Sequence, residues 1–255
     1  HFFMDAFRTQ EDDSLSIKWR MDIESMAFDN CNRSFQNPYK VKKVGDFNPY
    51  DISVSDINGC IFVRAFEKDS IYILLEDLSM KEKSNFAIEN ISATVSGNND
   101  YLGIEKLLFK TENSNVNIAN MLLYHNNYQS FKNPIEQLRT EIEILPSAIN
   151  LSDFAAFRPS LATIHDKISL KGKAYGKSEK FQLVDFQLKY GQSTIASGDF
   201  YVKNLYPDPN NLLIDATVEE LSTTMPELDE LLTGTLNKEI RIPTFLDSMG
   251  KVTYQ

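Results

Sequence analysis

The sequence has few of the residues on which catalytic and metal sites depend. Its 255 residues include three histidines, two cysteines and one tryptophan. His1, His125 and His165 form no HxxE or HExxH motif, and Cys31 and Cys60 lack CxxC spacing and a neighbouring histidine. No GxSxG, Walker-type or GxGxxG motif occurs. These absences predict a protein with no metal, no cofactor and no enzymatic activity, whereas spacing alone leaves a disulfide between the cysteines open.

Positive charge and long hydrophobic runs are also scarce. The 26 basic and 36 acidic side chains give a formal charge of −10, which repels a phosphate backbone and argues against a nucleic-acid partner. No run approaches the roughly 18 apolar residues of a membrane span, and no signal-peptide pattern opens the chain. We interpret the abrupt apolar start, HFFMDAF, as typical of a fragment or a processed product.

Alternation of apolar and polar residues is abundant, and it predicts an all-β protein with antiparallel, meander-like pairing. It is clear in residues 15–23, 116–124 and 212–218; in the second of these ranges Val116, Ile118, Leu122 and Tyr124 are expected to share a face. Turn-forming residues separate the apolar runs. They are Asn58-Gly59, Ser96-Gly97-Asn98-Asn99, Tyr190-Gly191-Gln192 and Pro207-Asp208-Pro209-Asn210-Asn211.

Helical patterns are short and few. Residues 133–139 and 152–161 have capping residues, and Pro159 interrupts the second segment. A helix near 225–233 is expected from Pro226 at its start and Gly234 at its end. The resulting organisation is a first β module at 1–132, a short helical connection at 133–165, and a second β module at 166–255 that ends at the start of a further repeat.

The strands around residues 181–205 carry more apolar residues than one buried face needs. Simple alternation gives one face to Val184, Phe186, Leu188 and Tyr190 and the other to Phe181 and Leu183; Ala196, Phe200 and Val202 likewise oppose Tyr201 and Leu205. One interpretation is a closed sandwich core whose second face is covered by the short helices. The other is a curled sheet whose inner face holds acyl chains.

Residues 47–116 contain an ordered set of elements. A strand ending at Asp56-Ile57 precedes an apolar strand, an LSxxExSxF element at 78–86, and a strand closing on KTENS at 110–114. Residues 150–255 add the DFAAF segment at 153–157 followed by glycine-containing strands. In this order and texture, over nearly its whole length, the chain resembles the TamB/AsmA-like envelope proteins of diderm bacteria, particularly the long versions of the Bacteroides-type lineage.

The resemblance implies an elongated, curled antiparallel sheet, a half-pipe or β-taco with a hydrophobic interior. It further implies a periplasmic segment of a bridge that conducts phospholipids between the inner and outer membranes. Such a bridge is tethered to the inner membrane by a segment not present in this chain and reaches toward an outer-membrane barrel protein. The residues expected to line the groove and contact acyl chains are Val184, Phe186, Leu188, Phe200, Val202, Leu212, Ile214 and Val218.

Two other functions fit the same pattern. A scaffold that assists the assembly of outer-membrane β-barrel proteins would pair its exposed strand edges with client strands. An extracellular β-sandwich adhesin or sugar binder would instead have a shallow aromatic site.

Overall fold

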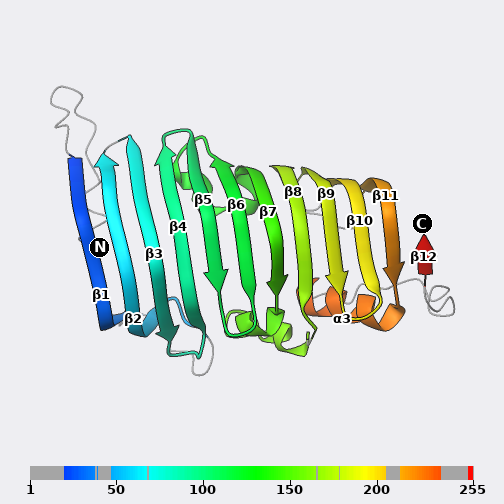
Figure 1. Ribbon diagram of the computed structural model, residues 1–255, viewed down its shortest axis with the longest axis horizontal. Helices are drawn as coiled ribbons and strands as arrows, with labels where there is room; N and C mark the ends of the chain where they lie inside the picture. Colours follow the sequence, from blue (N-terminus) through cyan, green and yellow to red (C-terminus); the bar gives the residue numbers. More distant parts are fainter. Residues whose placement is uncertain are drawn as a thin grey trace.

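The chain forms one large antiparallel sheet. The computed structural model describes residues 20–37, 39, 47–67, 69–164, 166–177, 179–204, 213–236 and 252–254. Within them, 12 strands follow one another in chain order, each paired with its sequence neighbours (Figure 1). The strands are β1 Arg20–Gln36, β2 Asp51–Glu67, β3 Ser70–Glu82, β4 Ala87–Asn98, β5 Tyr101–Lys110, β6 Asn115–Tyr124, β7 Arg139–Ile149, β8 Ile168–Lys177, β9 Lys180–Tyr190, β10 Thr194–Lys203, β11 Leu213–Thr223 and β12 Val252–Tyr254.

The helices are short and lie at the ends of the strands. Following β6 come η1 Tyr128–Lys132 and α2 Pro134–Gln137, and following β7 come η2 Leu151–Phe154 and η3 Pro159–Thr163. The longest, α3 Met225–Leu236, follows β11. The predicted all-β, elongated and curled sheet is therefore confirmed, as is the helix expected near 225–233.

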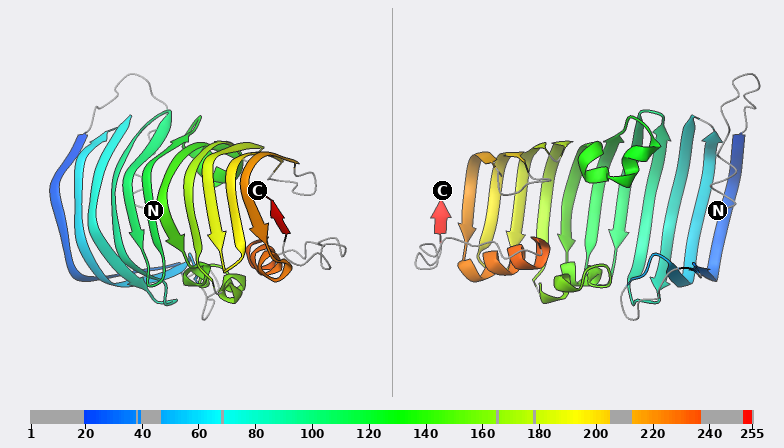
Figure 2. Two further views of the ribbon diagram at one scale, coloured as in Figure 1. Left: turned by 45° about the vertical axis from the view of Figure 1, so that its right-hand side comes forward. Right: turned by 180° about the vertical axis from the view of Figure 1, so that it is seen from behind.

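Most strands contain a bulge near the middle. Asn30, Asp56, Asp77, Lys106 and Asp185 have φ angles between +48° and +53°, and the register of the pairing shifts beside each of them. An extra residue in one strand bends that strand and increases its twist. Because bulges occur in strand after strand, the sheet bends along a line that crosses it, and the strands are visibly arched (Figure 2).

Polar side chains of the adjacent strands satisfy the amides that the bulges free. The Asp77 amide donates to Ser92 Oγ at 2.9 Å, and the Asp185 amide donates to Asp199 Oδ1 at 2.9 Å. The Asn30 amide donates to Asn58 Oδ1 at 2.8 Å. These hydrogen bonds lie at the exposed surface, where each contributes modestly, and together the asparagine, serine and aspartate side chains support the bend.

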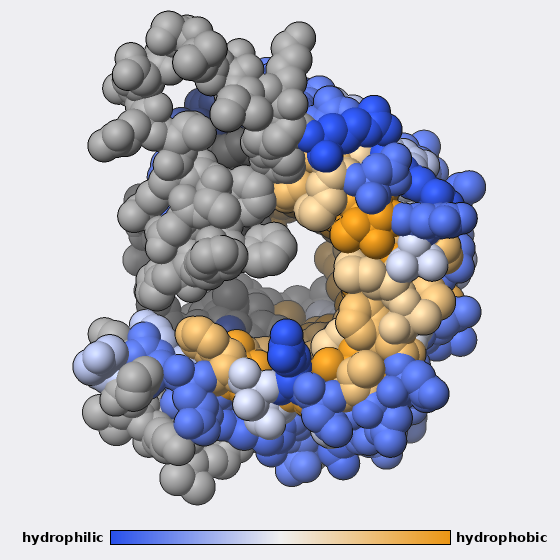
Figure 3. Space-filling model, turned by 90° about the vertical axis from the view of Figure 1, so that its left-hand side faces the viewer, coloured by the Kyte–Doolittle hydropathy of each residue, from blue (hydrophilic) through white to orange (hydrophobic). Residues whose placement is uncertain are grey.

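The arched strands enclose a trough, which we define as the concave face of the sheet. Seen from the β1 end, its inside is lined by hydrophobic residues and its outside is covered by hydrophilic ones (Figure 3). The strand ends form two long margins. The upper edge carries the β2–β3, β4–β5 and β8–β9 turns, and the lower edge carries the β3–β4, β5–β6 and β9–β10 turns together with η2, η3 and α3 (Figure 1).

Aromatic packing fixes the lower edge beneath β4 and β5. The ring of Phe154, from η2, lies 6.3 Å from Phe109 and 5.9 Å from Phe86, centroid to centroid. Phe157 follows with centroid distances of 4.7 Å to both Phe86 and Phe47. The DFAAF segment thus packs at the lower ends of β4 and β5, where ring–ring contacts stabilise the arrangement although Phe154 is only half-buried and Phe157 is 47% exposed.

Three expectations need correction. Asn58-Gly59 is not a hairpin turn but lies inside β2, where Gly59 has φ +119°. Residues 133–165 are not only a helical connection, because they contain β7, which pairs with β6 and β8 and makes the sheet continuous. Leu122 and Tyr124 do not share a face with Val116 and Ile118, because β6 has a register shift between Ile118 and Asn120.

The two cysteines are free thiols. Cys31 lies opposite Ile57, whereas Cys60, three residues further along β2, lies opposite Glu76.

Candidate functional site

The trough is lined by ladders of directly opposite residues. In an antiparallel sheet, residues opposite each other project from the same face. One ladder, the central ladder, takes a single residue from each strand from β1 to β11, and every member is apolar. It runs Ile23, Val63, Ile73, Val95, Ile104, Met121, Ile142, Ala174, Leu183, Phe200 and Ala216.

A parallel ladder, the upper ladder, lies nearer the upper edge. It also crosses from β1 to β11 and contains no charged residue. It runs Met21, Phe66, Ile71, Gly97, Leu102, Leu123, Thr140, Gly176, Phe181, Val202 and Ile214. At about 4.8 Å per strand, each ladder is roughly 50 Å long, so the apolar strip extends from β1 to β11.

The bulge at Asp185 determines which side chains of β9 face the trough. Leu183 lies opposite Phe200, and the ring of Phe200 meets the ring of Phe186 edge-on at 6.3 Å. Phe186 and Leu183 therefore project from the same face, although simple alternation would separate them. On β9 the exposed residues are Gln182, Asp185, Gln187 and Lys189, together with Lys180 at its start.

Most of the predicted groove residues lie in the trough. Those on the concave face are Phe186, Leu188, Phe200, Val202, Ile214 and Val218. Val184 lies on the convex face instead, because it pairs with Lys173, whose ammonium contacts Glu143 at 3.5 Å. Leu212 lies outside the described residues.

The trough is not filled by packing of the sheet against itself. Among the described hydrophobic residues, only Val63 and Ala174 of the two ladders are counted in the buried core. Ile214 is 60% exposed, and apart from the buried Gly97 the other members range from half-buried to exposed. A closed sandwich of this size would bury most of these side chains at native packing density. An exposed apolar strip of this extent is typical of a binding surface.

Three ionised carboxylates hold the lower edge together. Glu227 of α3 accepts hydrogen bonds from the Gln192 amide at 3.1 Å, the Ser193 amide at 3.1 Å and Thr194 Oγ1 at 2.6 Å. Partial burial alone would raise the pKa of Glu227, but these hydrogen bonds outweigh it and lower the pKa. The carboxylate therefore fastens α3 to the β9–β10 turn.

Asp153 and Glu82 also accept several hydrogen bonds that hold segments together at the lower edge of the trough. Asp153 accepts from Ser114 Oγ at 2.6 Å, from Asn113 and from Thr111, so η2 is fastened to the β5–β6 turn. Glu82 accepts from the Ser84 amide at 2.7 Å and the Ser53 amide at 3.2 Å. Burial opposes ionisation of both groups, but the hydrogen bonds prevail and lower each pKa.

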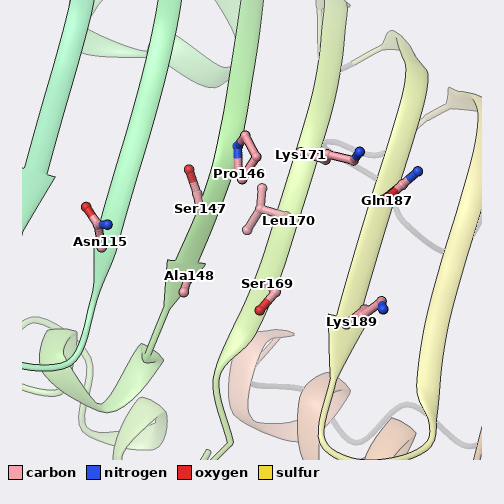
Figure 4. Close-up of a pocket in the computed structure, with 9 residues that line it drawn as sticks. All are labelled: Asn115, Pro146, Ser147, Ala148, Ser169, Leu170, Lys171, Gln187 and Lys189. Carbon is pink, nitrogen blue, oxygen red and sulfur yellow. The ribbon is translucent and has the colours of Figure 1, made fainter.

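The convex face bears a separate depression of about 340 Å³ over β6 to β9. Lys171 and Gln187, which lie opposite each other, and Lys189 surround it with Asn115 and Pro146 (Figure 4). It is shallow and open to solvent, and the sheet separates it from the trough.

The N-terminal half of the trough was missed by sequence reasoning, although it contributes as many ladder residues as the C-terminal half. Ile73, Val95 and Ile104 are examples. The alternation in each strand was visible, but the phase changes at Asp77 and Lys106 required knowledge of the pairing.

No helix among the described residues is long and apolar enough to cross a membrane. The same residues contain no group of three or more His, Cys, Asp or Glu side chains arranged to hold a metal ion. No protein-family model, curated protein or solved structure matches the chain.

Proposed function

We propose that this chain is a segment of a periplasmic, TamB/AsmA-like bridge that conducts phospholipids between the inner and outer membranes along the trough. In this proposal the chain is not an enzyme, and its ligands are phospholipid acyl chains. The longer protein is tethered to the inner membrane and reaches an outer-membrane barrel protein. The observation that supports the proposal best is the central ladder, which presents an uninterrupted apolar strip from β1 to β11.

Acyl chains would lie against the two ladders while the headgroups stay in water at the strand ends. Each CH₂ group moved from water onto the strip is favourable by about 0.8 kcal/mol. Because hydrophobic burial is non-directional, a lipid shifted by one strand spacing meets an equivalent surface. Movement along the trough then needs no catalytic residue.

A strand-pairing scaffold for barrel proteins is the alternative, and β1 favours it. Over its 17 residues β1 pairs with β2, and no strand that the structure describes pairs with its other edge. A free strand edge offers backbone groups to a client strand. Crosslinks between β1 and nascent barrel strands, without lipid in the trough, would favour this role.

Photo-crosslinking from adjacent positions of β9 tests lipid conduction. A photoreactive phenylalanine analogue at Phe186 faces the trough, and the same analogue at Gln187 faces outward and is the matched control. After incubation with phospholipid vesicles, intact-protein mass spectrometry should find lipid adducts at position 186 and few at 187. Equal labelling at the two positions, or none at 186, would refute the proposal.

Arginine substitutions give a second measurement. Phe186→Arg and Val202→Arg place charges on the strip and should reduce copurifying phospholipid at least tenfold. Gln187→Arg should leave it unchanged. Circular dichroism establishes that each variant is folded before lipid is measured.

A further inference from the structure

Three lysines stand side by side at the upper edge of the trough. Lys177 of β8 lies opposite Lys180 of β9, and Lys180 also lies opposite Lys203 of β10. Opposite residues of an antiparallel pair have Cβ atoms about 5 Å apart, and like charges at such positions are destabilising. The arrangement is more unusual because the chain as a whole has a formal charge of −10.

No acidic side chain that the structure describes forms an ion pair with these lysines. Neighbouring cations are neutralised, since Arg139 contacts Glu141 at 3.2 Å and Lys173 contacts Glu143 at 3.5 Å. Glu179, in the turn between Lys177 and Lys180, is exposed and lies in no such pair. The ammonium of Lys203 lies 5.1 Å from the centroid of the Tyr201 ring, a contact that leaves its charge uncompensated.

The lysines adjoin the apolar strip. Each is one residue away from a member of the upper ladder: Gly176 precedes Lys177, Phe181 follows Lys180, and Val202 precedes Lys203. One residue along a strand is about 3.3 Å. Because neighbouring residues leave the strand on opposite faces, the lysine stems start on the convex face, where the Lys203 ammonium lies over Tyr201. Each stem is long enough to turn its ammonium toward the strand end, beside the headgroup of a lipid in the trough.

We propose that Lys177, Lys180 and Lys203 bind the phosphate group of a lipid whose acyl chains lie against Phe181 and Val202. This inference rests on the proposed function and adds the headgroup chemistry and the orientation of the lipid. A phosphate relieves the repulsion among the lysines by accepting charge-assisted hydrogen bonds from them. The lower edge, with the ionised carboxylates of Glu82, Asp153 and Glu227, repels the same group, so the headgroup is held at the upper edge.

A comparison of two lipids and two lysine variants tests the site. Phosphatidylglycerol and diacylglycerol with identical acyl chains differ in the phosphate-bearing headgroup. The purified chain should retain phosphatidylglycerol about tenfold more than diacylglycerol, as measured by native mass spectrometry. Lys180→Glu should remove that preference while leaving diacylglycerol retention unchanged.

Lys189→Glu is the matched control, because Lys189 is an exposed lysine on the same strand at its lower end. Lys189→Glu should change the retention of neither phosphatidylglycerol nor diacylglycerol. Lys180→Glu removes two like-charge contacts, so its melting temperature should be no lower than that of the original chain.

The outcomes separate this inference from the proposed function. Equal retention of both lipids by the original chain overturns the phosphate site but leaves lipid conduction standing. Retention of neither lipid overturns both. Inorganic phosphate distinguishes a site for a free anion from a site for a lipid headgroup. The lipid assignment is wrong, and the site binds free phosphate, if phosphate without lipid raises the melting temperature and Lys180→Glu abolishes that rise while phosphatidylglycerol retention persists.

Discussion

Replacement of Gly198 by alanine tests whether the mid-strand bend shapes the trough. Gly198 lies in the middle of β10 with φ +134°, between Phe186 of β9 and Val218 of β11. A Cβ added there would lie 2.2 Å from the backbone oxygen of Thr217 and 3.1 Å from the amide of Glu219. These are backbone atoms of the adjacent strand, so a rotamer change cannot relieve the overlap.

The expected loss of stability follows from two contributions. A side chain at this φ is strained by about 1–3 kcal/mol. Moving β11 away weakens one or two of its hydrogen bonds to β10, at about 1 kcal/mol each. The sum is about 3 kcal/mol, which corresponds to a fall in melting temperature of roughly 6–12 °C for a domain of this size.

Urea denaturation of Gly198→Ala, followed by far-UV circular dichroism, measures the change. Gly97→Ala is the control, because Gly97 also faces the trough but has no positive φ. Its added Cβ would lie 3.1 Å from the Tyr101 backbone oxygen and 3.2 and 3.3 Å from side-chain atoms of Ile71 and Leu102. The control should lose less than about 1 kcal/mol. If Gly198→Ala were as stable as the original chain within about 0.5 kcal/mol, the bend would not depend on this glycine.

Two further predictions concern the carboxylates of the lower edge. Glu227→Ala should lower the free energy of unfolding by about 2 kcal/mol, because it removes charge-assisted hydrogen bonds to the β9–β10 turn, whereas the exposed control Glu219→Ala should have little effect in the same urea titration. Acid should also destabilise the protein, because the folded-state pKa values of Glu82, Asp153 and Glu227 are lowered. The stabilisation from these carboxylates is fully present above the ordinary pKa values of 4.5 for glutamate and 3.8 for aspartate. It is lost as the pH falls through the folded-state pKa values. Thermal melts between pH 7 and pH 3 measure this; a melting temperature that stays constant down to pH 3 would contradict it.

The fold class was predictable because its signals are local. The alternation within each strand, the Tyr190-Gly191-Gln192 turn and the helix that begins near Pro226 each depend on a few consecutive residues, and the structure contains all three. Pro159, expected to interrupt the helical segment at 152–161, separates η2 from η3 and is the first residue of η3. Local patterns of this kind determine which elements form, and short connections between successive strands favour a meander.

Which residues of each strand face the trough could not be predicted from local patterns. The sequence favours a turn at Asn58-Gly59, because asparagine and glycine both tolerate positive φ. Tolerance of positive φ suits a β-bulge as well as a turn, and only the pairing of β2 with β1 and β3 distinguishes a bulge from a turn here. The misplacement of Val184 has the same origin, since Asp185 shifts the alternation within β9 by one residue.

The apparent excess of apolar residues in β9 disappears once the bulge is included. Phe181 and Leu183 precede the phase change and Phe186 and Leu188 follow it, so all four face the trough. The convex face keeps the glutamine and lysine side chains and, of the apolar residues discussed, Val184 alone. A strand that looks apolar on both faces is therefore a strand with one apolar face and a bend. The same bend that concentrates the apolar residues also arches the sheet, which keeps the two halves of each strand from forming a flat layer that another sheet could cover. The sequence feature that first suggested a ligand thus has its physical cause in the bulges, and the open apolar trough is their direct consequence.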